Sequence, residues 1–279
     1  MKKLTKLTAI LTLVAFSLTM FATMAPAAPL SGTITMSGST SVQPLAELLK
    51  ADFAKKNPGV TITIAGGGSG VGVKDVTEGK VNIGNASRAL KEAEIAAGLV
   101  PNTIAYDAIC VIVNPKNPVK ALTTEQVTKI FTGEITNWSA VGGKNAPIFV
   151  NKRTAPSGTM DFFKESFMGE GKEIVATAKQ HDGNGLMVKA VAANANAVGF
   201  CSMGYVNKTI KALPIDGIAA TKDNAIAGTY KHVRPLNMVT KGAATGLAKS
   251  FIDYALSAAG QKIAGTEWIP VAQNPKKKK

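Results

Sequence analysis

Residues 34–70 read ITMSGSTSVQPLAELLKADFAKKNPGVTITIAGGGSG, and this stretch decides the fold class. The short apolar run at 34–36 predicts a strand that ends in a glycine–hydroxyl turn. Apolar residues then recur at helical spacing, at Val42, Leu45, Leu49 and Phe53. Asn57-Pro58-Gly59 stops this helix, and the alternating β-branched residues 60–65 predict a second strand. A strand, a helix and a strand in succession favour α/β layering.

The rest of the chain alternates strand-like and helix-like segments in the same way. Strands are predicted at 80–85, 104–114, 147–151, 197–206 and 232–240. Helices are predicted at 86–97, 123–130 and 188–192, around Phe162–Phe167, and in a last long helix with Leu247, Phe251 and Leu256 on one face. We predict two lobes, each a mixed β-sheet flanked by helices, joined by a hinge of two strands near Asn114 and Arg234-Pro235. Lobe 1 would comprise residues 28–113 plus 234–273, and lobe 2 residues 114–233.

The N-terminus is typical of a secretory signal. Lys2, Lys3 and Lys6 precede an apolar stretch at 7–21, and Ala25-Pro26-Ala27 offers small residues at A-x-A spacing. A membrane anchor is the rival interpretation, but about 15 apolar residues fall short of the roughly 20 that a span needs. We therefore predict a cleavable signal peptide at 1–27 and a periplasmic location.

The net charge of the chain is +14. Without the N-terminal lysines and the basic tail at 274–279, 25 basic residues face 18 acidic ones, a net charge of +7. A mild positive field raises the local concentration of anions. The basic residues are scattered and do not alternate with aromatic ones, so we expect no nucleic-acid partner.

Two cysteines, Cys110 and Cys201, lie inside apolar runs. They could be buried free thiols, or they could pair in an oxidising compartment. With only His181 and His232 besides, no group has the spacing of a zinc site, and we expect neither a metal nor a cofactor.

Three stretches place hydroxyls and glycines where an extended run gives way to a helical pattern. They are Gly38-Ser39-Thr40-Ser41, Gly66-Gly67-Gly68-Ser69-Gly70 and Arg153-Thr154-Ala155-Pro156-Ser157-Gly158-Thr159. Glycine allows the backbone to approach a ligand closely, and a helix N-terminus offers unpaired N–H groups. Three such helix N-termini, if they lie close together, would form a binding site for a small anion. The alternatives are ordinary helix caps and a flexible surface turn.

Two arginines accompany these stretches. Arg153 would reach the anion from the end of a strand, and its guanidinium could donate hydrogen bonds to two oxygens of the anion at once. Arg88 follows Ser87 at another strand-to-helix junction, where it could bind the anion in the same way or pair with a carboxylate. Residues 66–72 fit no G-x-G-x-x-G register, and Gly79-Lys80 lacks the remaining residues of a P-loop. Dinucleotide and P-loop chemistry are therefore excluded.

The chain resembles the periplasmic phosphate-binding proteins of phosphate ABC transporters over nearly all of its length after the signal segment. Besides the three stretches, the resemblance rests on the runs at 130–138, 197–205 and 234–236. It implies a two-lobed, hinge-closing fold of the type II periplasmic-binding class, phosphate in the cleft, a membrane permease as partner, and a monomer without enzymatic activity. The residues it implies as phosphate-binding are Ser39, Thr40, Ser41, Ser69, Arg88, Arg153, Ser157, Gly158 and Thr159.

One departure from the family concerns selectivity. Well-known members carry an aspartate at the position of Arg88, where it accepts the proton that phosphate has and sulfate lacks. Here Arg88 would bind the anion directly or hold another carboxylate, with Asp107 and Asp161 as candidates. The third stretch also has Ala155-Pro156 where the family often shows an acidic residue and glycine.

Three other functions stay open at this point. The first is a binding protein for another tetrahedral oxyanion, such as sulfate, molybdate or arsenate. The second is a secreted serine hydrolase that uses Ser157 or Ser69, with His181 beside Asp182 as the base, although neither serine lies in a G-x-S-x-G elbow. The third is a structural or adhesive secreted domain.

Overall fold

The computed structural model describes residues 29–274, so the predicted signal peptide and most of the basic tail lie outside the described residues. The strands are β1 Ser31–Gly38, β2 Gly59–Gly67, β3 Ile83–Ala86, β4 Leu99–Val113, β5 Phe149–Arg153, β6 Lys179–His181, β7 Ala197–Ser202, β8 Lys211–Ala212 and β9 Val233–Lys241. The α-helices are α2 Gln43–Lys56, α3 Ser69–Thr77, α4 Glu92–Ala96, α5 Thr124–Thr132, α6 Gly158–Phe163, α7 Gly183–Ala193, α8 Lys222–Ile226, α9 Gly246–Leu256 and α10 Ala258–Glu267. Short 3₁₀ turns lie at Trp138–Val141, Met203–Tyr205 and Val271–Gln273, and α6 continues into a π-helical segment at Lys164–Met168.

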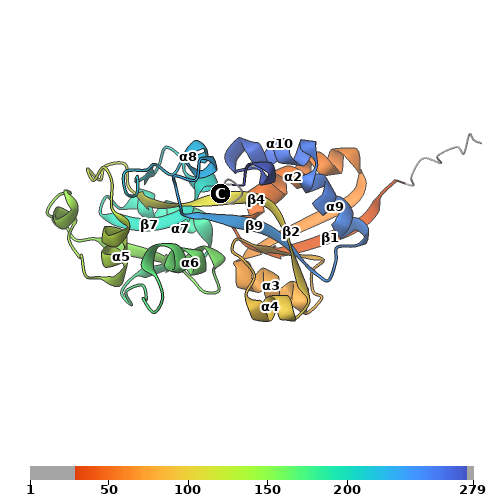
Figure 1. The fold of residues 1–279 in the computed structure, drawn as a ribbon, viewed down its shortest axis with the longest axis horizontal. Helices are drawn as coiled ribbons and strands as arrows, with labels where there is room; N and C mark the ends of the chain where they lie inside the picture. Colours follow the sequence, from red (N-terminus) through yellow and green to blue (C-terminus); the bar gives the residue numbers. More distant parts are fainter. Residues whose placement is uncertain (1–28, 275–279) are drawn as a thin grey trace, which may run out of the picture. The chain divides into compact units, whose positions relative to one another are not determined.

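The strands form one mixed sheet in the order β2-β1-β3-β9-β4-β7-β5-β6, with β8 beside β4. β1 pairs in parallel with β2 and β3, and β5 pairs in parallel with β6 and β7. β9 is antiparallel to both β3 and β4. In Figure 1, β1, β2 and α2–α4 lie at one end with α9 and α10, whereas α5–α7 and β7 lie at the other; β3 pairs with β1. We call the first group of elements lobe 1, and β5–β8 with α5–α8 lobe 2.

The long strand β4 connects the two lobes. It pairs with β9 from Leu99 to Ala108 and then with β7 from Ile109 to Val113, and Figure 1 shows β4 and β9 side by side between the lobes. The predicted α/β class with two strands in the hinge is therefore confirmed. The exchange of β9 for β7 lies earlier in β4 than the crossing predicted near Asn114.

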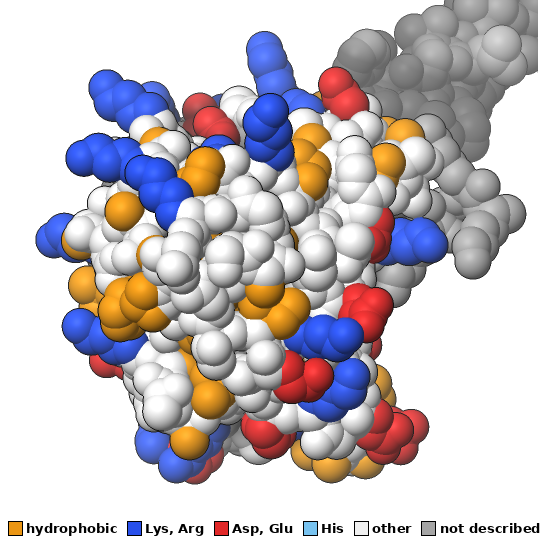
Figure 2. Space-filling model, turned by 90° about the vertical axis from the view of Figure 1, so that its left-hand side faces the viewer, with side chains coloured by type: hydrophobic (Ala, Val, Ile, Leu, Met, Phe, Trp, Pro, Cys, Tyr) orange, Lys and Arg blue, Asp and Glu red, His pale blue; other side chains and the backbone are white. Residues whose placement is uncertain are grey.

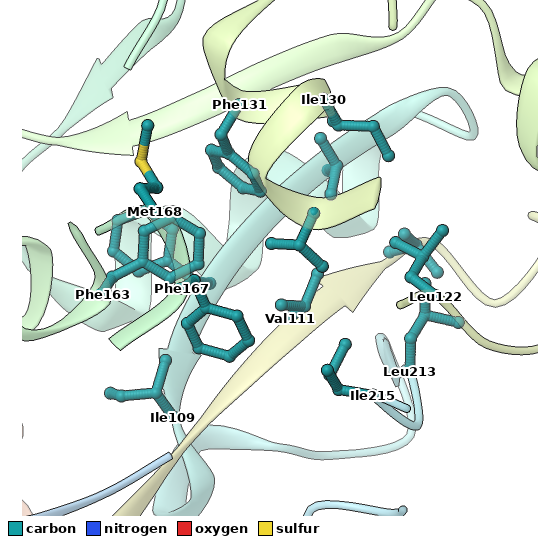
Figure 3. Packing of buried hydrophobic residues seen from close by; sticks show 14 of the residues in the cluster. Ile109, Val111, Leu122, Ile130, Phe131, Phe163, Phe167, Met168, Leu213 and Ile215 are labelled. Atoms are coloured by element: carbon teal, nitrogen blue, oxygen red, sulfur yellow. The ribbon is translucent and has the colours of Figure 1, made fainter. Parts of the chain in front are cut away.

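Each lobe has its own apolar core. In lobe 2, Phe163 stacks on Phe200 with ring centroids 4.0 Å apart, and Phe131 packs against both rings. Figure 3 shows this cluster closing around Ile109 and Val111 of β4. Burial of each such aromatic side chain contributes a few kcal/mol, which fixes the strand ends that carry the polar motifs.

One predicted helix begins later in the structure, and a further helix follows the last predicted one. The helix predicted at 86–97 begins only at Glu92, because the Glu94 carboxylate accepts the N–H of Lys91 at 2.8 Å and the N–H of Ser87 is bonded to the Ser69 hydroxyl. The predicted last long helix is α9, which contains Leu247, Phe251 and Leu256, and a further helix, α10, follows it. Ser257 separates them and caps α10, since its hydroxyl accepts the N–H of Gly260. Leu256, predicted to face the core, is exposed.

The two cysteines lie directly opposite each other in the antiparallel pair β4–β7. Both are free thiols and both are buried, and burial raises their pKa values. Within residues 29–274, no helix is long and apolar enough to span a bilayer.

His232 should make the protein sensitive to acid. Its ring stacks on Phe167 with centroids 3.6 Å apart, and its Nδ1 lies 2.6 Å from the Ser166 hydroxyl. Burial lowers the pKa of His232 from 6.5 to about 4. Between these values the unfolded chain binds a proton that the folded chain does not, so stability falls as the pH drops from 6.5 to 4.

We expect the substitution His232→Gln to remove up to about 3 kcal/mol of this pH-dependent loss. Urea denaturation at pH 6.5, 5 and 4 measures it. The substitution His181→Gln is the matched control, because that ring is only partly buried. Equal pH slopes for wild type and His232→Gln would refute the assignment.

Candidate functional site

The first predicted motif forms the turn between β1 and α2. Gly38 has a φ of +123°, and a Cβ there would lie 2.4 Å from the Asn85 carbonyl oxygen, so only glycine fits. The Ser39 hydroxyl accepts the N–H groups of Ser41 at 3.1 Å and Val42 at 3.4 Å. Ser39 therefore shapes the turn, while Thr40 and Ser41 reach across to lobe 2.

Both of these residues bond to lobe 2. The Ser41 hydroxyl lies 3.0 Å from the Thr159 hydroxyl, and Arg153 Nη2 donates to Thr40 Oγ1 at 3.4 Å. The hydroxyl of Tyr205 donates to the Thr40 carbonyl oxygen at 2.8 Å. The first and third motifs, more than 110 positions apart in the sequence, thus meet where the lobes meet.

The glycine-rich turn before α3 is in backbone contact with the third motif. A Cβ at Gly68 would lie 2.3 Å from the Pro156 carbonyl oxygen, and a Cβ at Gly158 would lie 2.2 Å from Ser69 Oγ. Ser69 Oγ itself accepts the N–H of Ser87 at 3.0 Å and is buried. The glycines in both motifs are required by this close approach.

The third motif joins β5 to α6. Arg153 ends the strand, the Ser157 hydroxyl accepts the N–H of Met160 at 3.3 Å as the helix cap, and Gly158 and Thr159 form the buried first turn. The peptide bond between Ala155 and Pro156 is cis. The structure thus brings all three motifs together, as the sequence predicted.

Arg153 is a buried cation without a counter-ion. Its side chain is 3% exposed, and no carboxylate of the described residues forms an ion pair with it. Nε donates to the His181 carbonyl oxygen at 3.2 Å, whereas the buried Nη1 has no hydrogen-bond partner in the described part of the chain. Burial and the neighbouring Arg234 lower the pKa of Arg153 to about 10, which leaves the guanidinium charged at neutral pH. Such a group is costly to bury unless an anion joins it.

Sequence reasoning assigned no site role to a second buried arginine, Arg234. Its Nη2 lies 2.8 Å from Asp107 Oδ2 and also donates to the Ser41 hydroxyl at 2.8 Å. Arg234 and Asp107 are both fully buried. Burial raises the pKa of Asp107, and Arg234 opposes that shift. Asp107, named as a candidate partner of Arg88, is instead the partner of Arg234, because β4 and β9 place the two residues opposite each other.

Asn184 was missed as well. It lies at the start of α7, fully buried, and its side-chain amide donates to Thr40 Oγ1 at 3.2 Å and to Ser41 Oγ at 2.9 Å. An asparagine after a glycine is common in loops and caps, so only the fold reveals this contact.

Arg88 directs its guanidinium at carboxylates. Nη1 and Nη2 bind Glu94 at 2.8 and 2.7 Å, and Nε lies 3.3 Å from Asp161 Oδ2 without the alignment of a hydrogen bond. The bond to Glu94 raises the pKa of Arg88. Because Asp161 belongs to α6 and Arg88 to lobe 1, this ion pair bridges the lobes. The geometry favours the alternative in which Arg88 holds a carboxylate in place.

The arrangement lacks the parts of a serine hydrolase. Neither Ser69 nor Ser157 contacts a histidine in the described range, and His181 Nε2 is bonded to Asn151 at 2.8 Å. Residues 29–274 also contain no cluster of His, Cys, Asp and Glu that could hold a metal. A groove of about 720 Å³ between α5 and α7 is lined by none of the nine predicted residues.

Comparison with known proteins agrees with this arrangement. The PBP superfamily domain matches residues 23–259. The phosphate-binding protein PstS of Bacillus subtilis is 36% identical over 246 residues, which cover 86% of this chain and 81% of that protein. A crystal structure of a phosphate ABC transporter substrate-binding protein from Clostridium perfringens, with bound phosphate, is 41% identical with a TM-score of 0.84, covering 86% of this chain and all of that one.

An ABC-type phosphate transport receptor from Vibrio cholerae is also similar in structure. It is 34% identical with a TM-score of 0.71, covering 85% of this chain and 99% of that one. This chain belongs to the PBP superfamily and, within it, to the family of PstS phosphate-binding proteins.

Proposed function

We propose that this protein binds inorganic phosphate between its two lobes and delivers it to the membrane permease of a phosphate ABC transporter. The observation that carries the proposal is the buried, uncompensated guanidinium of Arg153 among hydroxyls from both lobes. A tetrahedral oxyanion supplies the missing charge and can accept several hydrogen bonds at once. The similarity to PstS proteins and to a phosphate-bound transporter subunit supports this ligand.

Of the nine residues predicted from the sequence, six belong to the proposed ligand set, and the other three support it. Thr40, Ser69 and Thr159 would contribute hydroxyls, Ser41 would orient that of Thr159, Arg153 would contribute its guanidinium, and Gly158 its backbone. Ser39 and Ser157 hold the turns, and Arg88 closes the lobes through Asp161. Lobe 1 is taken as residues 28–113 plus 234–273 and lobe 2 as 114–233.

In the proposed mechanism the protein binds and releases phosphate without making or breaking covalent bonds. Phosphate that bridges both lobes shifts the population toward the closed form, which the permease would recognise. We propose that the protein is a monomer, exported to the periplasm through a signal peptide at 1–27. Figure 2 shows Lys and Arg side chains spread over the lobe 2 end and interspersed with acidic ones, consistent with a mild general field for anions.

Calorimetric titration with phosphate tests the proposal, with mass spectrometry of any anion that co-purifies. At 100 times the Kd, phosphate should stabilise the fold by about 2.7 kcal/mol, which raises Tm by roughly 5–10 °C. Absence of both heat and thermal shift would refute it. Sulfate, molybdate and arsenate are titrated in competition, because Arg88 occupies the place of the family's proton-accepting aspartate. Sulfate binding as tight as that of phosphate would assign the protein to a broader class of oxyanion carriers.

A further inference from the structure

We propose that Asn184 is a positioning residue that leaves the hydroxyl proton of Thr40 and, through Ser41, that of Thr159 available to the bound anion. This inference rests on the proposed function and names a residue that acts through others. The amide of Asn184 is completely buried, and it joins α7 of lobe 2 to the turn after β1 in lobe 1.

The orientation of the Asn184 amide is fixed by its neighbour in β7. The backbone N–H of Ser202 lies 3.2 Å from Asn184 Oδ1, and an N–H can only donate. The oxygen of the amide must therefore face Ser202, and the NH₂ group must face the two hydroxyls. A flipped amide would leave the N–H of Ser202 unpaired and place Oδ1 against the hydroxyls.

The bonds around Ser41 then determine where its proton points. Its oxygen accepts from Asn184 Nδ2 at 2.9 Å and from Arg234 Nη2 at 2.8 Å, which fills both lone pairs. Its single proton is left for Thr159 Oγ1, 3.0 Å away. Thr159 accepts that bond, so its own proton is available to an anion.

The hydroxyl of Thr40 is also held as an acceptor of N–H groups. Its oxygen receives N–H groups from Asn184 Nδ2 at 3.2 Å, from the Asn184 backbone at 3.4 Å and from Arg153 Nη2 at 3.4 Å. All of these are donors, so the hydroxyl proton of Thr40 is not used among them. Asn184 thus leaves the hydroxyls of Thr40 and, through Ser41, of Thr159 as donors, which is the polarity that an oxyanion requires.

A double-mutant cycle tests this role by phosphate calorimetry. Asn184→Ala should weaken phosphate binding roughly 10- to 30-fold in the wild type, because two neutral hydrogen bonds are lost. In the background of Thr40→Ala with Ser41→Ala, the same change should cost less than about threefold, since its targets are gone. Equal factors in both backgrounds would overturn the proposal, because a merely structural asparagine would act additively.

A second variant keeps the packing and reverses the polarity. Asn184→Asp retains the acceptor for Ser202 but offers a carboxylate to Thr40 and Ser41, which would draw the proton of Thr40 away from the anion and that of Ser41 away from Thr159. We expect at least a 100-fold loss of phosphate affinity. Asn114→Asp is the matched control, because Asn114 donates to the carbonyls of Val191 and Ala192 at the other end of α7.

The control should bind phosphate within threefold of wild type, and Asn184→Asp binding as tightly as wild type would refute the role. Circular dichroism confirms that each variant is folded. Failure of the wild type itself to bind phosphate would count against the proposed function, which separates the two claims.

Discussion

Replacing Arg153 by alanine is expected to weaken phosphate binding by roughly 10²–10³-fold, more than the loss of any single hydroxyl in the site. The guanidinium is buried, has no carboxylate partner in the described range and keeps one nitrogen unpaired. Loss of a buried, charge-assisted partner costs about 3–4 kcal/mol. Removing one hydroxyl, as in Ser69→Ala, should cost about 0.5–1.5 kcal/mol, or at most roughly tenfold. Calorimetry on the two variants compares them directly.

Arg153 should also lower the free energy of unfolding of the ligand-free protein. Because Arg153 is desolvated and lies near Arg234, it destabilises the fold until an anion arrives. Arg153→Met keeps much of the volume without the charge, so its Tm without phosphate should equal or exceed that of wild type, while the phosphate-induced shift disappears. Arg153→Lys should recover part of the affinity, since lysine restores the charge but not the fork. A phosphate loss no larger than that of Ser69→Ala would remove Arg153 from its assigned role.

The parts of the site that the sequence predicted are those with a strong local signal. Gly38, Gly68 and Gly158 stand at close backbone approaches where a Cβ cannot fit, and hydroxyls beside them mark the helix starts. Such local requirements appear in the sequence whatever the distant parts of the chain do. The contact between Thr40 and Arg153 could be predicted because all three motifs lie at the ends of strands in one sheet.

The contacts that the sequence did not predict join distant parts of the chain and do not depend on local pattern. Asp107 lies inside the apolar run of β4, and its importance comes from Arg234, which β9 places opposite it. Asn184 has an ordinary loop sequence around it, and its partners come from the other lobe. The late start of the helix predicted at 86–97 has the same origin, because the backbone of Ser87 forms hydrogen bonds with Ser69 and with Arg234. Register between distant strands cannot be read from a single sequence.

Asp107→Asn is expected to lower the stability of the phosphate-free protein by about 3–5 kcal/mol, the usual cost of breaking a buried ion pair. The change is nearly isosteric, but it leaves Arg234 without its anion in a region that already contains Arg153. Urea denaturation without phosphate measures the loss. Asn102→Ala is the control, because that residue pairs with the same strand β9 but is remote from any ion pair.

Phosphate should restore part of that stability. With Asp107 neutralised, neither Arg153 nor Arg234 has an ion-pair partner among residues 29–274, so the bound anion compensates more charge and the phosphate-induced rise in Tm should be larger in Asp107→Asn than in wild type. A purely structural Arg234–Asp107 pair would give the same phosphate-induced shift in both proteins. An equal rise in Tm would therefore show that the Arg234–Asp107 pair and the anion site are energetically independent. A larger rise in Asp107→Asn would show that the charges of Arg153 and Arg234 both interact with the bound anion.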